Sequence, residues 1–282
     1  MTRIHRPDLV PDAALSRADM EAMQHEIARE AVFEDDFAFD LETLTNPLAA
    51  TSASTSSGSG GGSSNGSGSS RHTGSTTQPV VAGVDQSFLL DSEPERALSA
   101  IVVTQGDEVL ERVFAVTPLE IPYVPGLLSF REGGPILEAV ENLTTDPDMF
   151  LFDGSGRIHF REAGIATHMG VVLDAPSVGV AKSLLCGEAT GDLENLAAGT
   201  RVPIEANARV ETDPGTLLGY AVQTKQYDSP NRYVNPLYVS PGHRVGPETA
   251  ADLALALSTG YKLPEPVRLA DSYADEAKGE LD

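Results

Sequence analysis

VVAGVD (80–85), LSAIVVT (98–104) and VLERVFAV (109–116) are the stretches that decide the fold of this chain. Short apolar runs rich in β-branched residues are typical of buried strands, so each of the three predicts a strand. The segment QGDE, between the second and the third run, contains a glycine and predicts a hairpin turn. The domain is therefore predicted to begin with three strands, of which the last two are joined by a tight turn.

Two more strands and two helices are predicted further along the chain. DMFLFDG (148–154) predicts a strand that ends at its second aspartate, and PSVGVAKSLL (176–185) predicts a strand that runs into a turn. GGPILEAVENL (133–143) and GPETAADLALALSTG (246–260) predict helices, the first with Pro135 at its start. This order is compatible with an α/β domain of the ribonuclease H-like type, in which helices flank a mixed sheet.

Composition divides the chain into three segments. Residues 51–77 are almost entirely Ser, Gly and Thr, and cannot bury enough apolar surface to become ordered. They predict a disordered linker between an N-terminal arm (1–50) that contains one helix and a main domain (78–282).

The N-terminal arm carries the signals of a helix that needs a partner. Ser16 and Asp19 form a capping-box pattern, and Leu15 and Met20 occupy the two positions of a hydrophobic staple. Apolar residues then recur every three to four positions, which predicts an apolar helical face that docks on the main domain. The acidic segment EDDFAFDLE (34–42) is expected to be solvated.

Length and composition also limit the class of protein. The chain has 282 residues, 40% of them hydrophobic, which is enough for one sizeable core. It contains no run of 18 apolar residues and no apolar segment after its basic N-terminal residues, so neither a membrane span nor a secretory signal is predicted. Its one cysteine, Cys186, excludes an intrachain disulfide and fits a reducing cytoplasm. The protein is expected to be a monomer.

The charge leaves two interpretations open. The chain has 42 acidic and 19 basic residues, a net charge of -23, and only four of its bases are lysines. A nucleic-acid-binding protein normally carries a basic surface. The net negative charge of this chain instead repels DNA, and its acidic residues repel one another. Both effects shrink at molar salt, where the Debye length is about 3 Å, so an extreme halophile is one interpretation. An acidic protein that does not bind nucleic acid is the other.

Three carboxylates are predicted to converge. Asp85 ends the first strand, Asp153 ends the fourth, and Glu132 directly precedes the first core helix. Close carboxylates repel one another unless a cation neutralises them, and hard oxygen ligands suit Mg²⁺ or Mn²⁺. Two such ions can activate water and stabilise a leaving oxygen. The alternative is that each acid is a turn or helix-terminal residue without a ligand.

Seven blocks of the sequence resemble the endonuclease V family. They occur in order along the chain and cover the whole main domain together with the leading helix. The blocks are MEAMQHEIAREAVFEDDF (20–37), VAGVDQSF (81–88), IPYVPGLLSFREGGPIL (121–137), FLFDGSGRIHFREAGIATHMG (150–170), SVGVAKSLLCG (177–187), NPLYVSPGHRVGPETA (235–250) and GYKLPEPVRLAD (260–271). The Ser/Gly linker departs from the family pattern but touches none of these blocks.

The resemblance implies a ribonuclease H-like fold and a DNA repair activity. The family cuts the second phosphodiester bond on the 3′ side of deoxyinosine and leaves 3′-hydroxyl and 5′-phosphate ends. By resemblance, Asp85 and Asp153 are the principal metal ligands and Glu132 completes the acidic site, with Mg²⁺ as the cofactor and Mn²⁺ as an alternative. His243 matches an active-site histidine that orients water or moves a proton, and Lys182 matches a lysine near the phosphate. A histidine bonded to backbone and a strand-end lysine are the alternative interpretations.

The resemblance also implies a wedge and a pocket for a flipped base. The wedge comprises Pro122, Tyr123, Val124 and Pro125, in which the tyrosine replaces the stacking lost when a base leaves the helix. Glycines permit close approach of backbone to the base, whereas leucines would sandwich its ring. The expected pocket residues are Gly126, Leu128, Gly154, Gly156, His159 and Leu185.

Three other functions remain open from the sequence. An inosine-specific endoribonuclease would use the same metal centre and pocket. A non-catalytic binder of damaged nucleic acid is disfavoured because all the expected acids are present. A resolvase or transposase of the ribonuclease H-like type is disfavoured by the wedge block around Tyr123.

Overall fold

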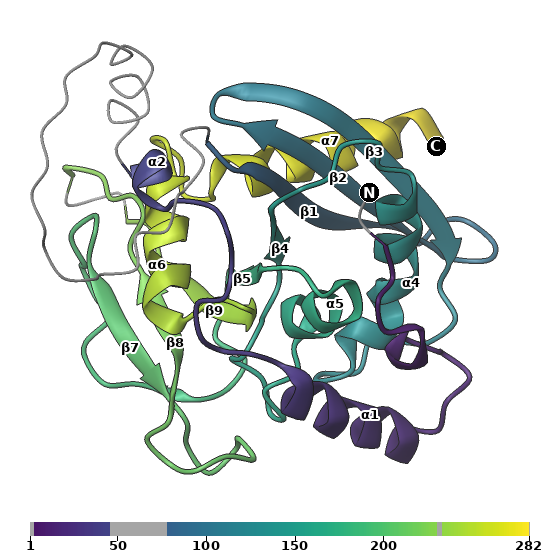
Figure 1. Cartoon of the computed structure of the whole chain (residues 1–282), viewed down its shortest axis with the longest axis horizontal. Helices are drawn as coiled ribbons and strands as arrows, with labels where there is room; N and C mark the ends of the chain where they lie inside the picture. The colour runs from purple at the N-terminus through teal and green to yellow at the C-terminus, as the bar shows by residue number, and fades with distance from the viewer. Residues whose placement is uncertain (1–2, 46–77, 230–232, 282) are drawn as a thin grey trace, which may run out of the picture.

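A single mixed β-sheet organises the protein. The computed structural model describes residues 3–45, 78–229 and 233–281. In this part of the chain nine strands form one sheet with the order β3-β2-β1-β4-β5-β9-β8-β7-β6 (Figure 1). The strands are β1 (Val80–Leu89), β2 (Arg96–Gln105), β3 (Glu108–Pro118), β4 (Met149–Asp153), β5 (Ser177–Ala181), β6 (Glu188–Ala189), β7 (Arg201–Glu205), β8 (Leu217–Val222) and β9 (Leu237–His243).

The strand directions explain how the sheet is assembled. Strands β1, β2 and β3 form an antiparallel meander, whereas β4 and β5 run parallel to β1. β9 then returns antiparallel to β5, and β8, β7 and β6 extend the sheet in antiparallel steps. The predicted hairpin is confirmed, because only residues 106 and 107 separate β2 from β3. Gly106 has φ 58°, a left-handed conformation that glycine adopts without steric cost.

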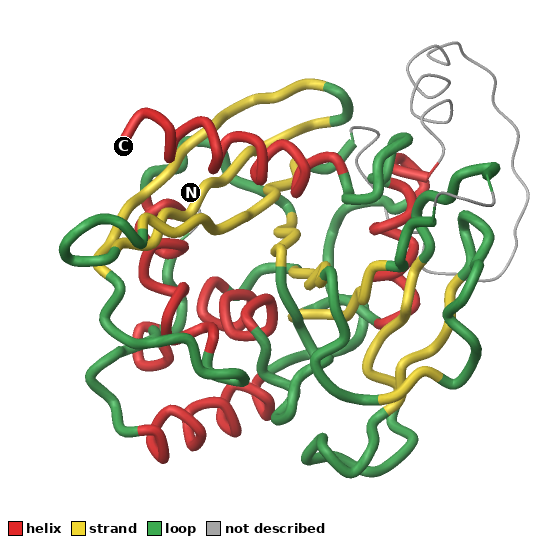
Figure 2. The backbone as a smooth tube through the Cα atoms, turned by 180° about the vertical axis from the view of Figure 1, so that it is seen from behind, coloured by secondary structure: helices red, strands yellow, loops and turns green. Residues whose placement is uncertain are grey.

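Helices cover both faces of the sheet, as predicted. α4 (Leu128–Glu141) and α5 (Ile165–Leu173) pack on one face, together with α1 (Arg17–Glu30). α6 (Pro247–Ala256) and α7 (Glu265–Leu281) pack on the other, and α7 runs along the first strands of the sheet (Figures 1 and 2). The short elements η1 (Pro7–Leu9) and α2 (Glu42–Thr45) belong to the N-terminal arm.

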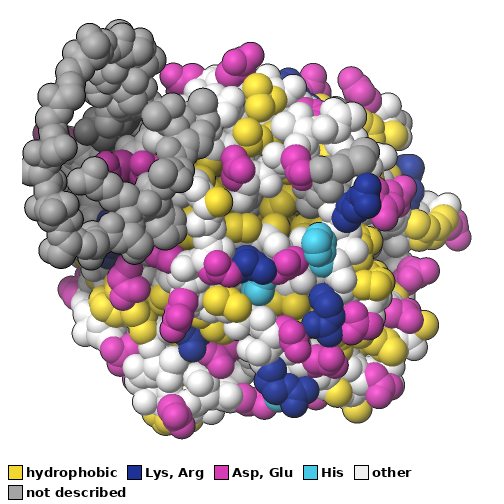
Figure 3. Space-filling view, in the orientation of Figure 1, with side chains coloured by type: hydrophobic (Ala, Val, Ile, Leu, Met, Phe, Trp, Pro, Cys, Tyr) yellow, Lys and Arg dark blue, Asp and Glu magenta, His cyan; other side chains and the backbone are white. Residues whose placement is uncertain are grey.

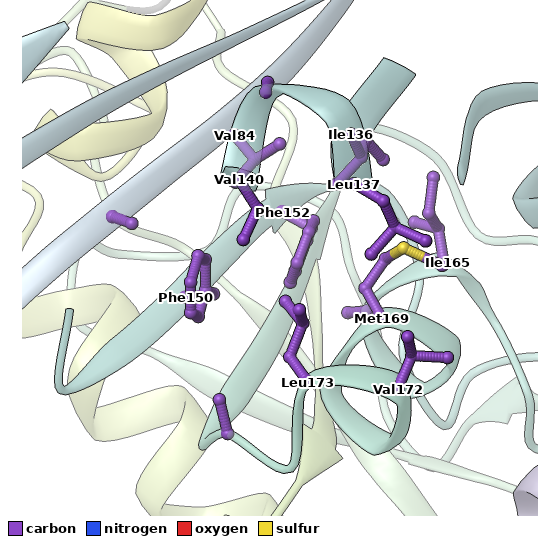
Figure 4. Packing of buried hydrophobic residues seen from close by; sticks show 14 of the residues in the cluster. Val84, Ile136, Leu137, Val140, Phe150, Phe152, Ile165, Met169, Val172 and Leu173 are labelled. Atoms are coloured by element: carbon purple, nitrogen blue, oxygen red, sulfur yellow. The ribbon is translucent and has the colours of Figure 1, made fainter. Parts of the chain in front are cut away.

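Alternation along the strands builds the two cores. Val84, Phe150 and Phe152 point to the face covered by α4 and α5, where they meet Val140 and Met169 (Figure 4). The intervening residues Val81, Met149 and Leu151 point to the opposite face, against α6 and α7. Side chains of a strand alternate between the two faces of the sheet. The residues of β1 and β4 that lie two or four positions beyond Val81, Met149 or Leu151 therefore also face α7. Asp85 and Asp153 are both in that set.

The N-terminal arm docks on the domain, as predicted. The Ser16 hydroxyl accepts a hydrogen bond from the Asp19 amide and caps α1. Met20 and the partly buried Leu15 share one apolar cluster, and Ile27 is fully buried against the α4–α5 core. The proposed disordered linker lies outside the described residues, so the three-segment division remains a prediction.

The acidic segment after α1 is exposed at Glu34, Asp35 and Asp36, as predicted, but its two phenylalanines pack on the domain. Phe37 and Phe39 stack with ring centroids 4.3 Å apart and pack against the α6 core. The two Asp35 carboxylate oxygens accept hydrogen bonds from the Gly246 amide and the Thr249 hydroxyl, at 2.6 Å each. The aspartate thereby caps the N-terminus of α6, an interaction that a local sequence pattern does not reveal.

Two predicted element boundaries are wrong. α4 begins at Leu128, so Pro135 lies inside the helix and Glu132 lies in its second turn instead of before it. β1 continues to Leu89, so Asp85 lies in mid-strand. Both errors have one cause, because packing against neighbouring elements extends helices and strands beyond the residues that signal their ends. Across the described residues, no helix combines the length and apolarity that a membrane span requires.

Candidate active site

Two aspartates meet where the pairing of β1 and β4 ends. The parallel register matches Val84 with Phe152, so Asp85 and Asp153 are the next residues along both strands. Both side chains point toward α7 by the alternation described above. The structure thus brings these two acids together, as the sequence predicted, although only β4 ends at its aspartate.

A third aspartate comes from α7. One carboxylate oxygen from each of Asp85, Asp153 and Asp271 lies within 4.8 Å of the others. Gly83 allows this approach, because a Cβ there would lie 2.0 Å from the Pro266 carbonyl oxygen at the start of the helix. From Pro266 to Asp271 the helix rises about 7.5 Å, and from Gly83 to Asp85 the strand rises about 6.6 Å. These similar distances place Asp271 beside Asp85.

Glu132 approaches from α4 but is not part of this three-aspartate group. Its side chain is buried, and burial raises its pKa to about 8, with a smaller contribution from the charge of Asp153. The adjacent guanidinium of Arg131 opposes this rise. A buried carboxyl with such a pKa is poised to exchange a proton near neutral pH, or to release it to water when a cation binds nearby.

The three-aspartate group is electrostatically strained without a cation. Burial, and next the charge of Asp153, raises the pKa of Asp85 to about 8. Lys182, directly after β5, places its Nζ 2.6 Å from Asp153 Oδ2 and 3.4 Å from Asp271 Oδ1. One ammonium group therefore faces three carboxylates. Hard, crowded oxygen donors with an excess of negative charge suit a divalent cation such as Mg²⁺.

A pocket opens beside these acids. Its volume is about 360 Å³, within the range of small-molecule sites. Of the residues predicted from the sequence, it is lined by Tyr123, Gly126, Leu128, Asp153, Gly154, His159, Lys182 and Leu185. Asp153 and Lys182 belong both to this pocket and to the acidic site, so a ligand in the pocket lies next to the carboxylates.

The wall of the pocket at Gly126 is held by two side chains. Gly126 has φ +84° and its carbonyl accepts a hydrogen bond from Gln24 Nε2 of α1 at 2.8 Å. His159 Nε2 lies 3.2 Å from the same carbonyl, while its Nδ1 accepts from the Arg161 amide. Burial, followed by the charge of Arg161, lowers the pKa of His159 to about 3, so the ring is neutral and its proton is on Nε2.

The remaining predicted residues surround the pocket without lining it. Pro122 and Pro125 are exposed in the loop that carries Tyr123, whose side chain is 63% exposed. Gly156 packs against β9, where a Cβ would lie 2.2 Å from the Pro241 carbonyl oxygen. Arg131 donates to the Ile121 carbonyl at 2.8 Å and lies over the Phe88 ring, so it anchors that loop.

His243 does not lie at the acidic site, contrary to the expectation from the sequence. It pairs with Ser177 at the start of β5, whereas Asp153 pairs with Val180. Three strand residues separate these positions, about 10 Å at 3.3 Å per residue. His243 Nδ1 accepts a hydrogen bond from the Val32 amide, and Nε2 lies 3.4 Å from Asp174 Oδ1. In this structure the histidine holds the N-terminal arm, which corresponds to the backbone-bonded alternative.

Comparison with known proteins is decisive once this geometry is established. The Endonuclease V family model matches residues 68–272. The chain belongs to the endonuclease V family. Endonuclease V of Haloarcula marismortui is 55% identical over 98% of both chains, and that of Natronomonas pharaonis is 48% identical over 96% of both. This protein is therefore a DNA repair endonuclease and a metal-dependent nuclease, as its family is.

Solved structures of the family share the fold. The catalytic domain of human endonuclease V is 30% identical, with a TM-score of 0.70 over 93% of this chain and 96% of that one. The Streptomyces avermitilis enzyme is 28% identical, with a TM-score of 0.70 over 94% of both chains. Endonuclease V of Ciona intestinalis, 23% identical with a TM-score of 0.66, was solved with DNA that contains an inosine followed by a ribo-adenosine; it covers 94% of this chain and 98% of its own. The predicted ribonuclease H-like fold is confirmed.

The halophilic origin is also supported. Haloarcula, Natronomonas and Halobacterium, the sources of three relatives that are 46–55% identical, are haloarchaea. Acidic side chains are widespread on the face shown in Figure 3, whereas lysines and arginines there are few and scattered. The charge of -23 therefore suits an endonuclease V that works at high salt, where short screening lengths relieve self-repulsion.

Sequence reasoning missed Asp271 and Gln24 of this endonuclease V. Asp271 is the last residue of the block 260–271, but it lies on a helix that also carries Asp275 and Glu276 at exposed positions. A periodic pattern does not distinguish an acid that faces the sheet edge from acids that face solvent. Gln24 lies on the apolar face of α1, where a buried polar residue was a signal that went unused.

Replacing Asp85 by asparagine is expected to raise the thermal stability of the metal-free enzyme at alkaline pH. The folded-state pKa of Asp85 is about 8, against about 3.9 for an unfolded chain. Between these values the folded protein binds a proton that the unfolded chain has released, so stability falls as the pH rises from about 4 to 8. Asparagine removes this loss of stability. The difference in Tm between Asp85→Asn and the wild type should therefore be absent near pH 4 and largest above pH 8.

The measurement is a Tm series in EDTA for wild type, Asp85→Asn and Asp107→Asn. Asp107 lies exposed in the β2–β3 turn and undergoes the same change of charge. Adding Mg²⁺ should narrow the gap in Tm, because the wild type, with all three aspartates, gains more binding energy from the ion than Asp85→Asn does. A Tm difference that is the same at pH 5 and pH 9 would contradict the electrostatic origin of the strain.

Proposed function

We propose that this endonuclease V hydrolyses the second phosphodiester bond on the 3′ side of deoxyinosine in DNA and leaves 3′-hydroxyl and 5′-phosphate ends. The observation that carries the proposal is that Asp153 and Lys182 belong both to the acidic site and to the pocket. A base held in the pocket therefore puts the following phosphates of its strand near the carboxylates. The inosine-containing DNA bound to the Ciona relative supports this choice of base.

We propose Mg²⁺ as the cofactor, with Mn²⁺ as an alternative. Asp85, Asp153 and Asp271 would hold the ion, and Glu132 lies close enough to Asp153 for the two carboxyl groups to interact electrostatically. When bound, the ion lowers the pKa of a water molecule and neutralises charge on the phosphate. The raised pKa of Glu132 suits it to hold or release a proton near neutral pH during hydrolysis.

Lys182 and Tyr123 would position the substrate. The Lys182 ammonium already bridges Asp153 and Asp271, so it can contact a phosphate oxygen that arrives between them. Tyr123 stands exposed at the rim of the pocket on a loop stiffened by two prolines. Its ring can replace the stacking of an extruded base, worth roughly 1–3 kcal/mol, and extrusion costs less for a weakly paired base such as hypoxanthine.

The pocket would recognise the base largely through backbone groups. Gln24 and the neutral His159 hold the Gly126 carbonyl in place, so this wall does not adjust to a different base. Leu128 and Leu185 supply apolar faces for the ring. These two donors occupy both lone pairs of the Gly126 carbonyl, so this wall would discriminate through its fixed shape, and a base that leaves a polar group unpaired against it is disfavoured.

A cleavage panel tests the proposal. With Mg²⁺ and molar KCl, an oligonucleotide with one deoxyinosine should be cut at the second bond on its 3′ side, and the matched deoxyadenosine strand should remain intact. Mapping the ends of the products locates the cut. Faster cleavage of an inosine-containing RNA would support the endoribonuclease instead, and tight binding without cleavage would support a non-catalytic binder.

A further inference from the structure

Lysines are rare in this chain and concentrate at one place. Of its four lysines, Lys182, Lys225 and Lys262 lie near the acidic site, while Lys278 lies in the last turn of α7. In a protein of net charge -23 that otherwise uses arginine as its base, this grouping is a local reversal of the overall composition.

The sheet brings these lysines to one edge. Tyr238 of β9 pairs with Ala181 of β5 on one side and with Ala221 of β8 on the other. Lys182 and Lys225, which follow those two strands, therefore leave the sheet at the same edge. That edge also carries Asp153, because β4 and β5 are parallel.

Lys262, just before α7, completes the group. The Thr224 hydroxyl donates to the Lys262 carbonyl at 2.5 Å, which holds Lys262 next to the segment that carries Lys225. Burial, and then repulsion by Lys182, lowers the pKa of Lys262. Among the described residues, neither Lys225 nor Lys262 forms an ion pair with a carboxylate, whereas Lys182 pairs with Asp153 and Asp271. Because the positive charges of Lys225 and Lys262 are not neutralised by carboxylates, they can attract an anion.

An exposed tyrosine lies among these cations. Tyr261 is 52% exposed, and its ring has Arg268 Cζ at 4.5 Å and Lys225 Nζ at 5.7 Å from the centroid. Lys225 Nζ also donates to the Gly260 carbonyl at 2.7 Å. These contacts hold two cationic groups against an aromatic face. Among the described residues, the acids paired with this group are Glu265, which pairs with Arg268, and Asp153 and Asp271, which pair with Lys182.

We propose that this lysine surface, formed by Lys182, Lys225, Tyr261, Lys262 and Arg268, binds the sugar–phosphate backbone of the cut strand on the 3′ side of the scissile bond. The inference rests on the proposed function, which fixes the polarity of the strand. The base pocket ends at Asp153 and Lys182, and its lining includes none of Lys225, Tyr261 and Lys262. A strand whose flipped base occupies the pocket passes the carboxylates and then meets the lysines, which match its charge.

The test compares K225Q/K262Q with the single variant K278Q and the charge-preserving K225R/K262R. KM is measured on inosine-containing duplexes whose strand either extends well beyond the cut or ends shortly after it. K225Q/K262Q should raise KM about tenfold on the extended substrate alone, and its salt dependence should be shallower by about 1.8 in log–log slope, for two lost phosphate contacts. Tm measurements establish that each variant is folded.

Each outcome decides between the two proposals. K278Q and K225R/K262R should match the wild type. If K225Q/K262Q has the wild-type KM on the extended substrate, or if its KM rises equally on both substrates, the proposal of a lysine surface is overturned. The cleavage proposal then still stands. If the wild type does not cut beside inosine, binding of undamaged duplex in EDTA still tests the surface. A weaker Kd and a shallower salt slope for K225Q/K262Q would then support it, and equal binding would overturn it.

Discussion

Replacing Asp153 by asparagine is expected to lower turnover by about 10³-fold or more while DNA binding remains measurable. Asp153 faces both Asp85 and Asp271 and receives the Lys182 ammonium at 2.6 Å. Removing its charge takes one of three close carboxylates from the proposed cation site. A lost contribution of several kcal/mol to the transition state corresponds to such a fall, since each 1.36 kcal/mol is a factor of ten in rate.

Single-turnover cleavage and a binding titration in Ca²⁺ together measure this effect. Asp107→Asn, at the exposed hairpin turn, is the control and should behave as the wild type. Wild-type cleavage by Asp153→Asn would remove the acidic site from the mechanism. Loss of binding in parallel with cleavage would show instead that the pocket wall, of which Asp153 is also part, has collapsed.

The second large effect is expected at Asp271, which only the tertiary structure identified. Asp271→Asn should lower turnover about 10²-fold, and it should raise the Mg²⁺ concentration needed for half-maximal activity, because two of the three aspartates remain. Asp275→Asn is the matched control, since it lies one helical turn further along α7 at an exposed position and changes the charge equally.

The comparison of these two variants separates ligation from general charge. If both lower activity to the same extent, the acidity of α7 matters and the position of Asp271 does not. If Asp271→Asn loses turnover without a change in its Mg²⁺ requirement, Asp271 acts on the substrate and not on the cation.

Local patterns predicted the parts of this protein that depend on neighbours in sequence. Short apolar runs rich in β-branched residues located the strands, the Ser16 cap located α1, and Asp153 was correctly placed at a strand end. Family motifs named eight of the seventeen residues that line the pocket, because these residues lie close together in sequence within the motif blocks. These features need no knowledge of which element packs against which.

Long-range packing decided the rest. The sequence by itself determined that strands would carry Asp85 and Asp153 in an α/β domain, because an apolar run and the acid that ends it are local features of the chain. Only the tertiary structure decided that Gly83 admits α7 with Asp271, that Gln24 reaches Gly126, and that His243 lies about 10 Å away along the sheet. Each of these depends on the burial of apolar faces by elements far apart in the chain, and no local pattern records which faces will meet.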